Sequence, residues 1–385
     1  MADSPAEAAP RTTGSKDRPW YPRFWCGLTI RGWFSLLARN RFAVTPRRWA
    51  MAAILTFLVF FNYVWCVLQA IFYGRRIART EIKEAPIFII GHWRSGTTML
   101  HEMMVLDRRY TYPDTYNCFA PNHFLSSGWL LRPSVGFLLP ARRPMDNMAA
   151  GWRRPQEDEF AMCNMGIRSP YLTLAFPNHP PQDQEYFELA GISRQELARW
   201  RGAFLWFLKC VTVQRPRRIV LKSPSHTFRI KVLLEMFPDA RFIHIVRDPY
   251  VLLPSTVKTW KSLYRSQGLQ VPRYEGLQEY VLETGRRMYE VFERDRDLIP
   301  PSHIAEVRYE DLVRDPIGVI RKVYERLELG GFDQALPALE QYVDAHKDYK
   351  TNIHEISEET RAEVERYWGA YIEKYGYGVA NPQSQ

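Results

Sequence analysis

The stretch PIFIIGHWRSGTTMLHEMM at residues 86–104 combines glycines, hydroxyl side chains and an arginine in a spacing that suits the binding of an anion. Its candidate binding residues are Arg94, Ser95, Gly96, Thr97 and Thr98. Gly91 and Gly96 permit a tight turn, and backbone N–H groups at the start of the following helix would point at the ligand. Loops of this kind that bind nucleoside triphosphates carry a lysine where this chain has Thr97. The missing lysine raises the question of which anion the loop binds.

A second cationic position is predicted at Arg247, in the stretch VRDPYVLLPSTV. Arg247 stands at the end of an apolar run, and Ser255 follows eight positions later, in the first turns of the next expected helix. An arginine fork and a hydroxyl that converge on one point suit a second phosphate group. Arginine–serine pairs are common in proteins, so this pair predicts a phosphate site only in combination with the loop described above.

Two further candidates, Lys222 and His226, occur in the stretch LKSPSHTFRIK. They flank the end of an apolar run and are expected beside the same edge of the sheet as the loop. A cation and a titratable imidazole there would lie close to a leaving group or an acceptor. The alternative for His226 is a structural role as a cap of the helix that follows.

The stretch RRPQEDEFAMCNMG, residues 153–166, supplies three consecutive carboxylates, Glu157, Asp158 and Glu159, just before an apolar helical run. Acidic residues favour a helix N-terminus on dipole grounds alone, which is the structural alternative. In a basic protein they would also supply a general base. Glu157 and Glu159 therefore compete with His226 for that role, and the glutamates are preferred.

Four apolar runs predict the strands that position these residues: 85–91, 217–223, 240–249 and 303–312. Helical patterns follow them, and parallel strands joined by helices form an α/β sheet of the doubly wound kind. Ligands bind such sheets where the strands end. The candidate residues described above stand at or just after the ends of these strands, apart from the three carboxylates.

The first part of the chain has a different character. Residues 1–20 are polar and rich in Pro and Ala, which predicts a disordered tail. Residues 21–49 contain tryptophans, leucines and arginines at helical spacing, which predicts an amphipathic membrane-surface segment. Residues 50–74 contain an uncharged run long enough for a transmembrane or membrane-embedded helix. The alternative is a buried helix of the globular domain, and arginines on both sides leave the orientation open.

Net charge and the spacing of cysteines and histidines indicate which classes of ligand to expect. The formal net charge of +10 favours an anionic partner such as a nucleotide, a sulfated substrate or lipid headgroups. The basic residues are scattered and accompany no zinc-finger or RNA-recognition signature, so nucleic acid is not expected. Five widely spaced cysteines predict free thiols, and the nine histidines show no paired-ligand spacing. We therefore expect no metal.

Taken together, these stretches resemble the sulfotransferases that use 3′-phosphoadenosine 5′-phosphosulfate (PAPS), in particular their large, mostly bacterial branch. The resemblance covers residues 85–385 and implies a P-loop-like parallel sheet flanked by helices. In that family an RSGTT-type loop binds the 5′-phosphosulfate, which implies Arg94 to Thr98 here. The family's arginine and serine for the 3′-phosphate correspond to Arg247 and Ser255. A sulfuryl group carries less charge than a γ-phosphate, so the loop can hold it without lysine or metal.

The resemblance implies metal-free, in-line transfer of a sulfuryl group from PAPS to a hydroxyl, or less readily an amine, with Lys222 stabilising the charge that develops on the bridging oxygen. The acceptor is expected to be a small molecule, a lipid or a glycan, and membrane lipids are expected partners. Two alternatives remain open: a kinase-like ATP-dependent phosphotransferase, and an inactive nucleotide-binding membrane scaffold. The expected location is a bacterial inner membrane with the catalytic domain in the cytoplasm, and a Golgi membrane is the alternative.

Overall fold

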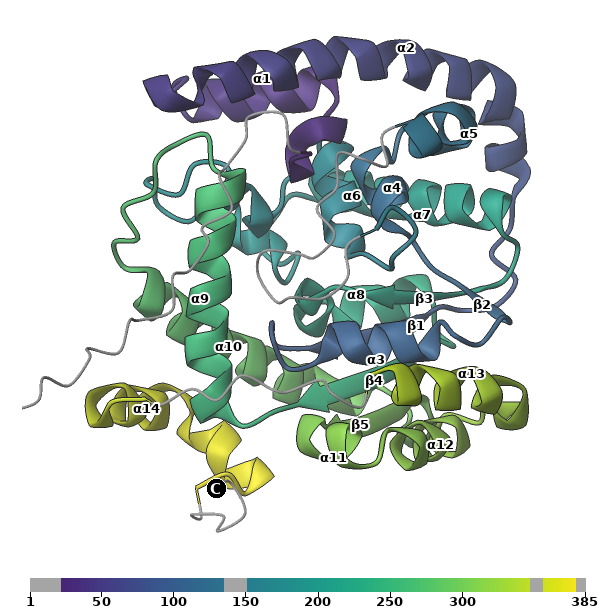
Figure 1. The fold of residues 1–385 in the computed structure, drawn as a ribbon, viewed down its shortest axis with the longest axis vertical. Helices are drawn as coiled ribbons and strands as arrows, with labels where there is room; N and C mark the ends of the chain where they lie inside the picture. Colours follow the sequence, from purple (N-terminus) through teal and green to yellow (C-terminus); the bar gives the residue numbers. More distant parts are fainter. Residues whose placement is uncertain (1–21, 135–150, 347–355, 379–385) are drawn as a thin grey trace, which may run out of the picture.

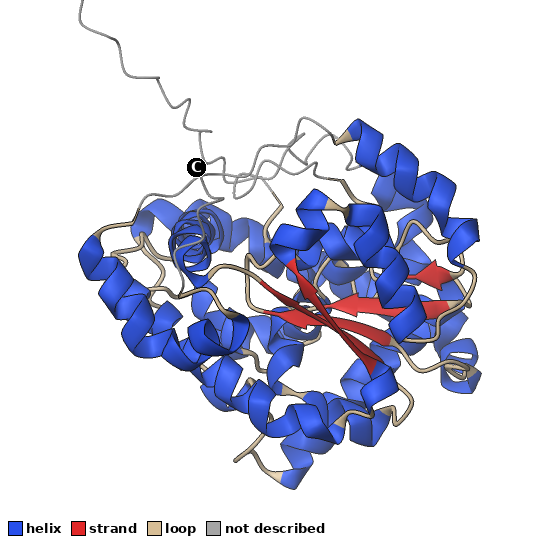
Figure 2. Cartoon of the chain, turned by 90° about the horizontal axis from the view of Figure 1, so that it is seen from below, coloured by secondary structure: helices blue, strands red, loops and turns tan. Residues whose placement is uncertain are grey.

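The computed structural model describes residues 22–134, 151–346 and 356–378, so the predicted N-terminal tail lies outside the described residues. A five-stranded parallel sheet in the order β2-β3-β1-β4-β5 forms its centre (Figure 2). The strands are β1 (Ile87–Gly91), β2 (Tyr110–Thr111), β3 (Arg218–Lys222), β4 (Arg241–Val246) and β5 (Ile304–Arg308). The four strands expected from the apolar runs are confirmed. The short edge strand β2 was not predicted, because two residues give no periodicity to recognise.

Helices surround this sheet. Those of the first half are α1 (Ile30–Arg39), α2 (Trp49–Arg79), α3 (Thr97–Met104), α4 (Thr115–Phe119), α5 (Phe124–Ser134), α6 (Asp158–Asn164) and α7 (Arg194–Gln214). Those of the second half are α8 (Ile230–Met236), α9 (Pro249–Gln267), α10 (Leu277–Asp295), α11 (Tyr309–Arg314), α12 (Pro316–Arg326), α13 (Phe332–Ala345) and α14 (Glu358–Tyr375).

Both faces of the sheet are buried, which explains why its strands are continuous apolar runs. Along β1, Ile87 and Ile89 pack on one face in a cluster with residues of α3 and α11 to α13. Phe88 and Ile90 pack on the other face, in a larger cluster that reaches α7, α8 and α2. In Figure 1, α11 to α13 lie below the sheet, and α2 runs along the opposite, upper side of the molecule. The predicted α/β architecture is confirmed.

The order of the strands fixes where a ligand can bind. The chain leaves β1, forms β2 and β3 on one side, and then returns to form β4 and β5 on the other side. In open parallel sheets the crevice at such a reversal, outside the carboxyl ends of the strands, is the binding site. The ends of β1, β3 and β4 are neighbours at this edge, and they carry Gly91, Lys222 and Arg247 respectively.

The N-terminal segment is part of the globular body. Its predicted membrane-facing side chains are buried in the protein: Trp25, Leu28, Trp33, Leu36 and Leu37. The Trp33 indole donates to the hydroxyl of Thr56 on α2 (3.0 Å), and the Trp25 indole donates to the carbonyl of Gln267 (2.8 Å). Any contact of residues 21–49 with a membrane must therefore use other side chains. The helical pattern itself was predicted correctly, but a pattern does not say what covers its apolar face.

Helix α2 contains the apolar run that was predicted at residues 50–74. By length and composition alone it could cross a membrane. In the structure one of its faces packs on the domain, with Met51, Leu55 and Val59 buried. All five cysteines lie within the described ranges and are unpaired.

Candidate active site

The loop after β1 makes a close-fitting turn that only glycine permits at two positions. Gly91 has φ 139°, and a Cβ there would lie 2.4 Å from the carbonyl oxygen of Ile245 on β4. Gly96 has φ 101°, and a Cβ there would lie 2.4 Å from the ring of Tyr309. Helix α3 begins directly afterwards at Thr97, as predicted. The two missing side chains let the Ile245 carbonyl and the Tyr309 ring pack directly against the turn, and the first N–H groups of α3 follow it at the end of β1, where an anion can bind.

Arg94 of this loop meets Arg247, which follows β4, and Ser255 of α9. The Arg94 Nε donates to the Ser255 hydroxyl on α9 at 3.1 Å. The Arg247 Nη1 donates to the carbonyl oxygen of Arg94 at 2.8 Å, and its guanidinium lies 4.0 Å over the ring of Tyr309. Burial lowers the pKa of the neighbouring His92 to about 4. That imidazole is therefore neutral near pH 7, and the positive charge at this place comes from the two arginines.

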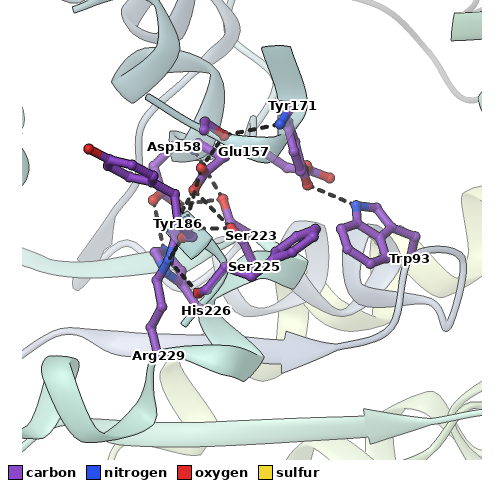
Figure 3. Close-up of polar contacts among 12 residues, drawn as sticks. Trp93, Glu157, Asp158, Tyr171, Tyr186, Ser223, Ser225, His226 and Arg229 are labelled. Atoms are coloured by element: carbon purple, nitrogen blue, oxygen red, sulfur yellow. Dashed lines mark hydrogen bonds and ion pairs between the residues drawn. The ribbon is translucent and has the colours of Figure 1, made fainter. Parts of the chain in front are cut away.

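The three consecutive carboxylates each meet a different cation. Glu157 precedes α6, and its Oε1 lies 2.7 Å from the Nζ of Lys222 at the end of β3. Its other oxygen, Oε2, accepts a hydrogen bond from the Tyr171 hydroxyl at 2.7 Å. The Tyr171 oxygen in turn accepts from the Trp93 indole at 2.8 Å. Figure 3 shows this chain of contacts, which connects the loop after β1 with the carboxylate of Glu157.

Asp158 and Glu159 point elsewhere. Asp158 accepts hydrogen bonds from the Ser223 hydroxyl (3.0 Å) and contacts His226 Nε2 (2.7 Å), and both acid and imidazole are fully buried. Burial opposes ionisation of Asp158, but the His226 ring and the Ser223 hydroxyl outweigh it and hold its pKa below the ordinary value. Each of the two groups satisfies the other's polar atom in the interior, and neither is open to a substrate.

Glu159 forms a buried pair with Arg229. Its oxygens contact the guanidinium nitrogens at 2.5 and 3.1 Å and also accept from the hydroxyls of Ser169 and Ser225. Arg229 further donates to the backbone carbonyls of Tyr186 and Phe187 and lies 5.2 Å over the ring of Trp200. Burial opposes ionisation of Glu159 too, but the charge of Arg229 and these hydrogen bonds hold its pKa below its usual value.

Exposure separates the predicted catalytic residues. The Glu157 side chain keeps 16% of its surface exposed, whereas Glu159 keeps 1% and His226 none. The structure thus brings Lys222 and Glu157 together at the edge of the sheet, and it places Glu159 and His226 in separate buried pairs. Arg229 and Tyr171 were not singled out from the sequence. The only signal for Arg229 was its position seven residues after Lys222 on the same segment.

A cavity of about 950 Å³ opens between α2, α5 and the end of α7. Its lining includes Tyr73, Gly128, Trp129, Trp152, Arg154 and Gln214. Arg154 stands three residues before Glu157, so their Cα atoms are at most ~11 Å apart. Glu157 and Lys222 themselves are not among the residues that line this cavity. Within the described ranges, no group of three or more His, Cys, Asp or Glu side chains could hold a metal ion.

Comparisons with known proteins give consistent matches. The model described as the sulfotransferase family matches residues 86–334. The chain is 47% identical, over 96% of its own length and 95% of the relative's, to omega-hydroxy-beta-dihydromenaquinone-9 sulfotransferase Stf3 of Mycobacterium bovis. It is 33% identical to carbohydrate sulfotransferase 5 of Mus musculus over 63% of this chain and 64% of that protein.

Solved structures show the same fold. The crystal structure of sulfotransferase STF9 from Mycobacterium avium matches with a TM-score of 0.65 at 19% identity, covering 90% of this chain and 96% of that one. Sulfotransferase STF1 from Mycobacterium tuberculosis matches with a TM-score of 0.59 at 17% identity, covering 81% and 86%.

Proposed function

This chain belongs to the sulfotransferase family and transfers a sulfuryl group to a hydroxyl acceptor, and on that premise we propose that PAPS is the donor, with its 5′-phosphosulfate on the loop after β1. The observation that carries the proposal is the convergence of Arg94, Arg247 and Ser255 at the tight glycine turn between β1 and α3. Arg94, Ser95, Gly96, Thr97 and Thr98 would hold the phosphosulfate. Arg247 and Ser255 would hold the 3′-phosphate, because a guanidinium and a hydroxyl suit a phosphate dianion.

Glu157 is the general base in this proposal. One of its oxygens is fixed by Lys222 and the other by Tyr171, so the carboxylate has one orientation and keeps lone pairs free for an acceptor hydroxyl. Glu157 would take the hydroxyl proton while the acceptor oxygen forms its bond to sulfur and the bond from sulfur to the bridging phosphate oxygen breaks. Lys222 would donate a hydrogen bond to that bridging oxygen as negative charge develops there. His226 and Glu159, which were predicted as competitors, would act as positioning residues through their buried pairs.

The acceptor is proposed to be a hydroxyl on a long apolar molecule that enters through the cavity between α2 and α5. Two supports are the hydroxylated menaquinone-type acceptor named for the 47%-identical relative and the cavity's mixture of aromatic and arginine side chains. An apolar tail would pack on Trp129 and Trp152, and the arginines would face polar groups. The protein would associate with a bacterial inner membrane and keep its catalytic domain in the cytoplasm.

The donor is tested by calorimetry with adenosine 3′,5′-bisphosphate in the presence of a chelator. We expect binding without metal, and we expect Arg247→Ala to weaken it about 10–100-fold, since a hydrogen bond to a charged group contributes about 1.5–3 kcal/mol. Arg241→Ala is the matched control, because Arg241 lies at the other end of β4 and contacts the carbonyls of Leu327 and Asp239. Equal affinity in the Arg247 variant, or tight binding of magnesium–ATP with none of the bisphosphate, would contradict the proposal and favour the phosphotransferase alternative.

The acceptor cavity is tested with Gly128→Leu on α5. Gly128 lines the cavity, and a Cβ there meets only the Tyr116 ring at 3.5 Å, an ordinary contact, so the larger side chain is expected to take up cavity volume. We expect KM for a hydroxylated menaquinone acceptor to rise about tenfold or more, in line with the ~1–3 kcal/mol by which a change of one methylene group alters substrate binding in an apolar pocket, while bisphosphate affinity stays unchanged. The control is Gly202→Leu on α7, where nothing lies within 4 Å of the added Cβ. Equal KM values in the two variants would place the acceptor elsewhere.

A further inference from the structure

Helix α2 presents an apolar face to the outside of the protein over most of its length. The exposed side chains of this face are Trp49, Ile54, Phe57, Phe60, Phe61, Tyr63, Val64, Val67, Ile71 and Phe72. Phe57, Ile71 and Phe72 are 67–72% exposed, which is unusual for large apolar side chains in a folded protein. No charged residue lies between Trp49 and Phe72. A surface of this kind needs an apolar partner.

The opposite face of α2 is tied to the domain along the helix. The Asn62 side chain donates to the carbonyl of Cys26 (2.6 Å), and Gln69 Oε1 accepts from the backbone N–H of Leu125 (2.9 Å). The carbonyl of Trp65 accepts from the Ser126 hydroxyl (3.1 Å), and further along the carbonyl of Ala78 accepts from Lys209 (3.2 Å). Figure 1 shows α2 lying flat along one side of the molecule, with α1 and α5 beneath it.

These contacts decide how α2 can meet a membrane. A helix that crosses the hydrocarbon core must be surrounded by lipid or by other apolar helices along ~30 Å of its length. Here the 31 residues from Trp49 to Arg79 lie side-on along the domain, in contact with α1, α5 and α7. To cross, α2 would have to leave the domain, and Asn62 and Gln69 would lose their partners in a medium that offers no replacement.

Basic side chains flank the apolar face at both ends. Exposed arginines precede and follow it: Arg41 and Arg47 before, and Arg75, Arg76 and Arg79 after. An apolar face between cationic ends matches a leaflet with anionic headgroups, in which the apolar side chains enter the headgroup–acyl boundary and the arginines meet phosphates. A second copy of the chain would instead bring these like charges close to one another if the helices packed in parallel.

We infer that α2 is an in-plane anchor: its outer face, from Trp49 to Phe72, inserts into one leaflet of an anionic membrane, and both ends of the helix stay on the same side. This replaces the transmembrane alternative of the sequence prediction. It also brings the mouth of the cavity that Tyr73 and Trp129 line to the lipid boundary. The inference rests on the geometry of α2 and does not depend on which donor or acceptor the enzyme uses.

The topology is tested by labelling one cysteine at a time with a membrane-impermeant maleimide. Ser35→Cys, before α2, and Glu81→Cys, after α2, report on which side of the membrane each end of the helix lies, since both positions are exposed. In both variants Cys26 and Cys66 are replaced by serine. In inverted inner-membrane vesicles from cells that express the full chain, we expect both positions to react, and in right-side-out vesicles neither. Opposite reactivity of the two positions in either preparation would show a spanning helix and overturn the inference.

The membrane contact is tested by sedimenting the purified full chain with vesicles of phosphatidylcholine, with or without phosphatidylglycerol. We expect stronger binding to the anionic vesicles, and we expect salt to weaken it. In Phe57→Asp/Ile71→Asp the vesicle affinity should fall about tenfold or more, because fully burying one such side chain contributes about 1.5–3 kcal/mol, which is a factor of ten or more. Leu298→Asp/Val313→Asp is the control, because both of its positions are exposed apolar residues away from α2. The inference would be refuted if both double variants lost vesicle binding equally. It would also be refuted if the native chain formed a dimer without vesicles and only the α2 variant were monomeric. Neither outcome depends on the result of the bisphosphate titration.

Discussion

Replacing Glu157 with glutamine is expected to lower kcat by about 10²–10⁴-fold, the usual contribution of a general base, and to leave bisphosphate affinity unchanged. The amide keeps an oxygen that can accept from Lys222 at the position where Oε1 now lies 2.7 Å from Nζ. It has no charge and cannot take a proton from the acceptor hydroxyl. The loss should therefore fall on the chemical step and not on binding of the donor.

The measurement is transfer of labelled sulfate from PAPS to a hydroxylated menaquinone, with kcat and KM determined separately. Tyr171→Phe is the graded control, since it removes only the hydrogen bond to Oε2 and should lower kcat less than the loss of the carboxylate. Asp158→Asn tests the buried neighbour, and its effect should appear in the unfolding midpoint. If Glu157→Gln kept kcat within about threefold of the native enzyme, the base would have to be another group.

The turn after β1 and the strands of the sheet could be predicted from the sequence because both are determined by residues close together in the chain. An apolar run that ends in glycine gives a buried strand and a tight turn in almost any surroundings, so β1 and the start of α3 at Thr97 were predicted correctly. The eight-residue spacing of Arg247 and Ser255 spans the end of β4 and the first turns of α9, which is also local. These features do not depend on what the rest of the chain does.

The roles of the three carboxylates were not accessible in the same way. Successive residues entering a helix point about 100° apart, so Glu157, Asp158 and Glu159 reach three different neighbours. Which of them meets Lys222 depends on how α6 is rotated against β3, and that is set by long-range packing. In the sequence the two glutamates differ only by position, so their exposure could not be compared.

The packing of the N-terminal helices also could not be predicted from the sequence. Hydropathy records that α2 is apolar but not which side faces the domain. One signal was present: Asn62 and Gln69 are seven residues apart, and Leu55 precedes Asn62 by the same interval, so the three share a face. Two polar residues on one face of an apolar helix indicate a protein partner on that side, and the structure provides it.

Replacing Arg229 with methionine is expected to destabilise the fold by about 3–5 kcal/mol, because it leaves the Glu159 carboxylate buried without its cation. Both side chains are at most 1% exposed, so water cannot take the place of the guanidinium. The carbonyls of Tyr186 and Phe187 lose donors as well. Urea unfolding measures the change, and Arg286→Met is the control: Arg286 pairs with Glu283 on the exposed face of α10 and should cost less than about 1 kcal/mol.

The pH dependence of this loss separates the ion pair from simple packing. In the native protein the pKa of Glu159 lies below its ordinary value of 4.5, so the stability that the pair contributes is present above that value and is lost as the pH falls through the lower, folded-state pKa. In the Arg229 variant a neutral, protonated Glu159 is the form that the interior accepts. The difference in unfolding free energy between native protein and variant should therefore shrink as the pH falls, from the raised pKa of Glu159 in the variant down to its lowered pKa in the native protein, and Glu159→Gln/Arg229→Met should recover part of the loss at pH 7. A difference that stays constant with pH, and a double variant no more stable than Arg229→Met alone, would show that Arg229 acts by filling space and not by its charge.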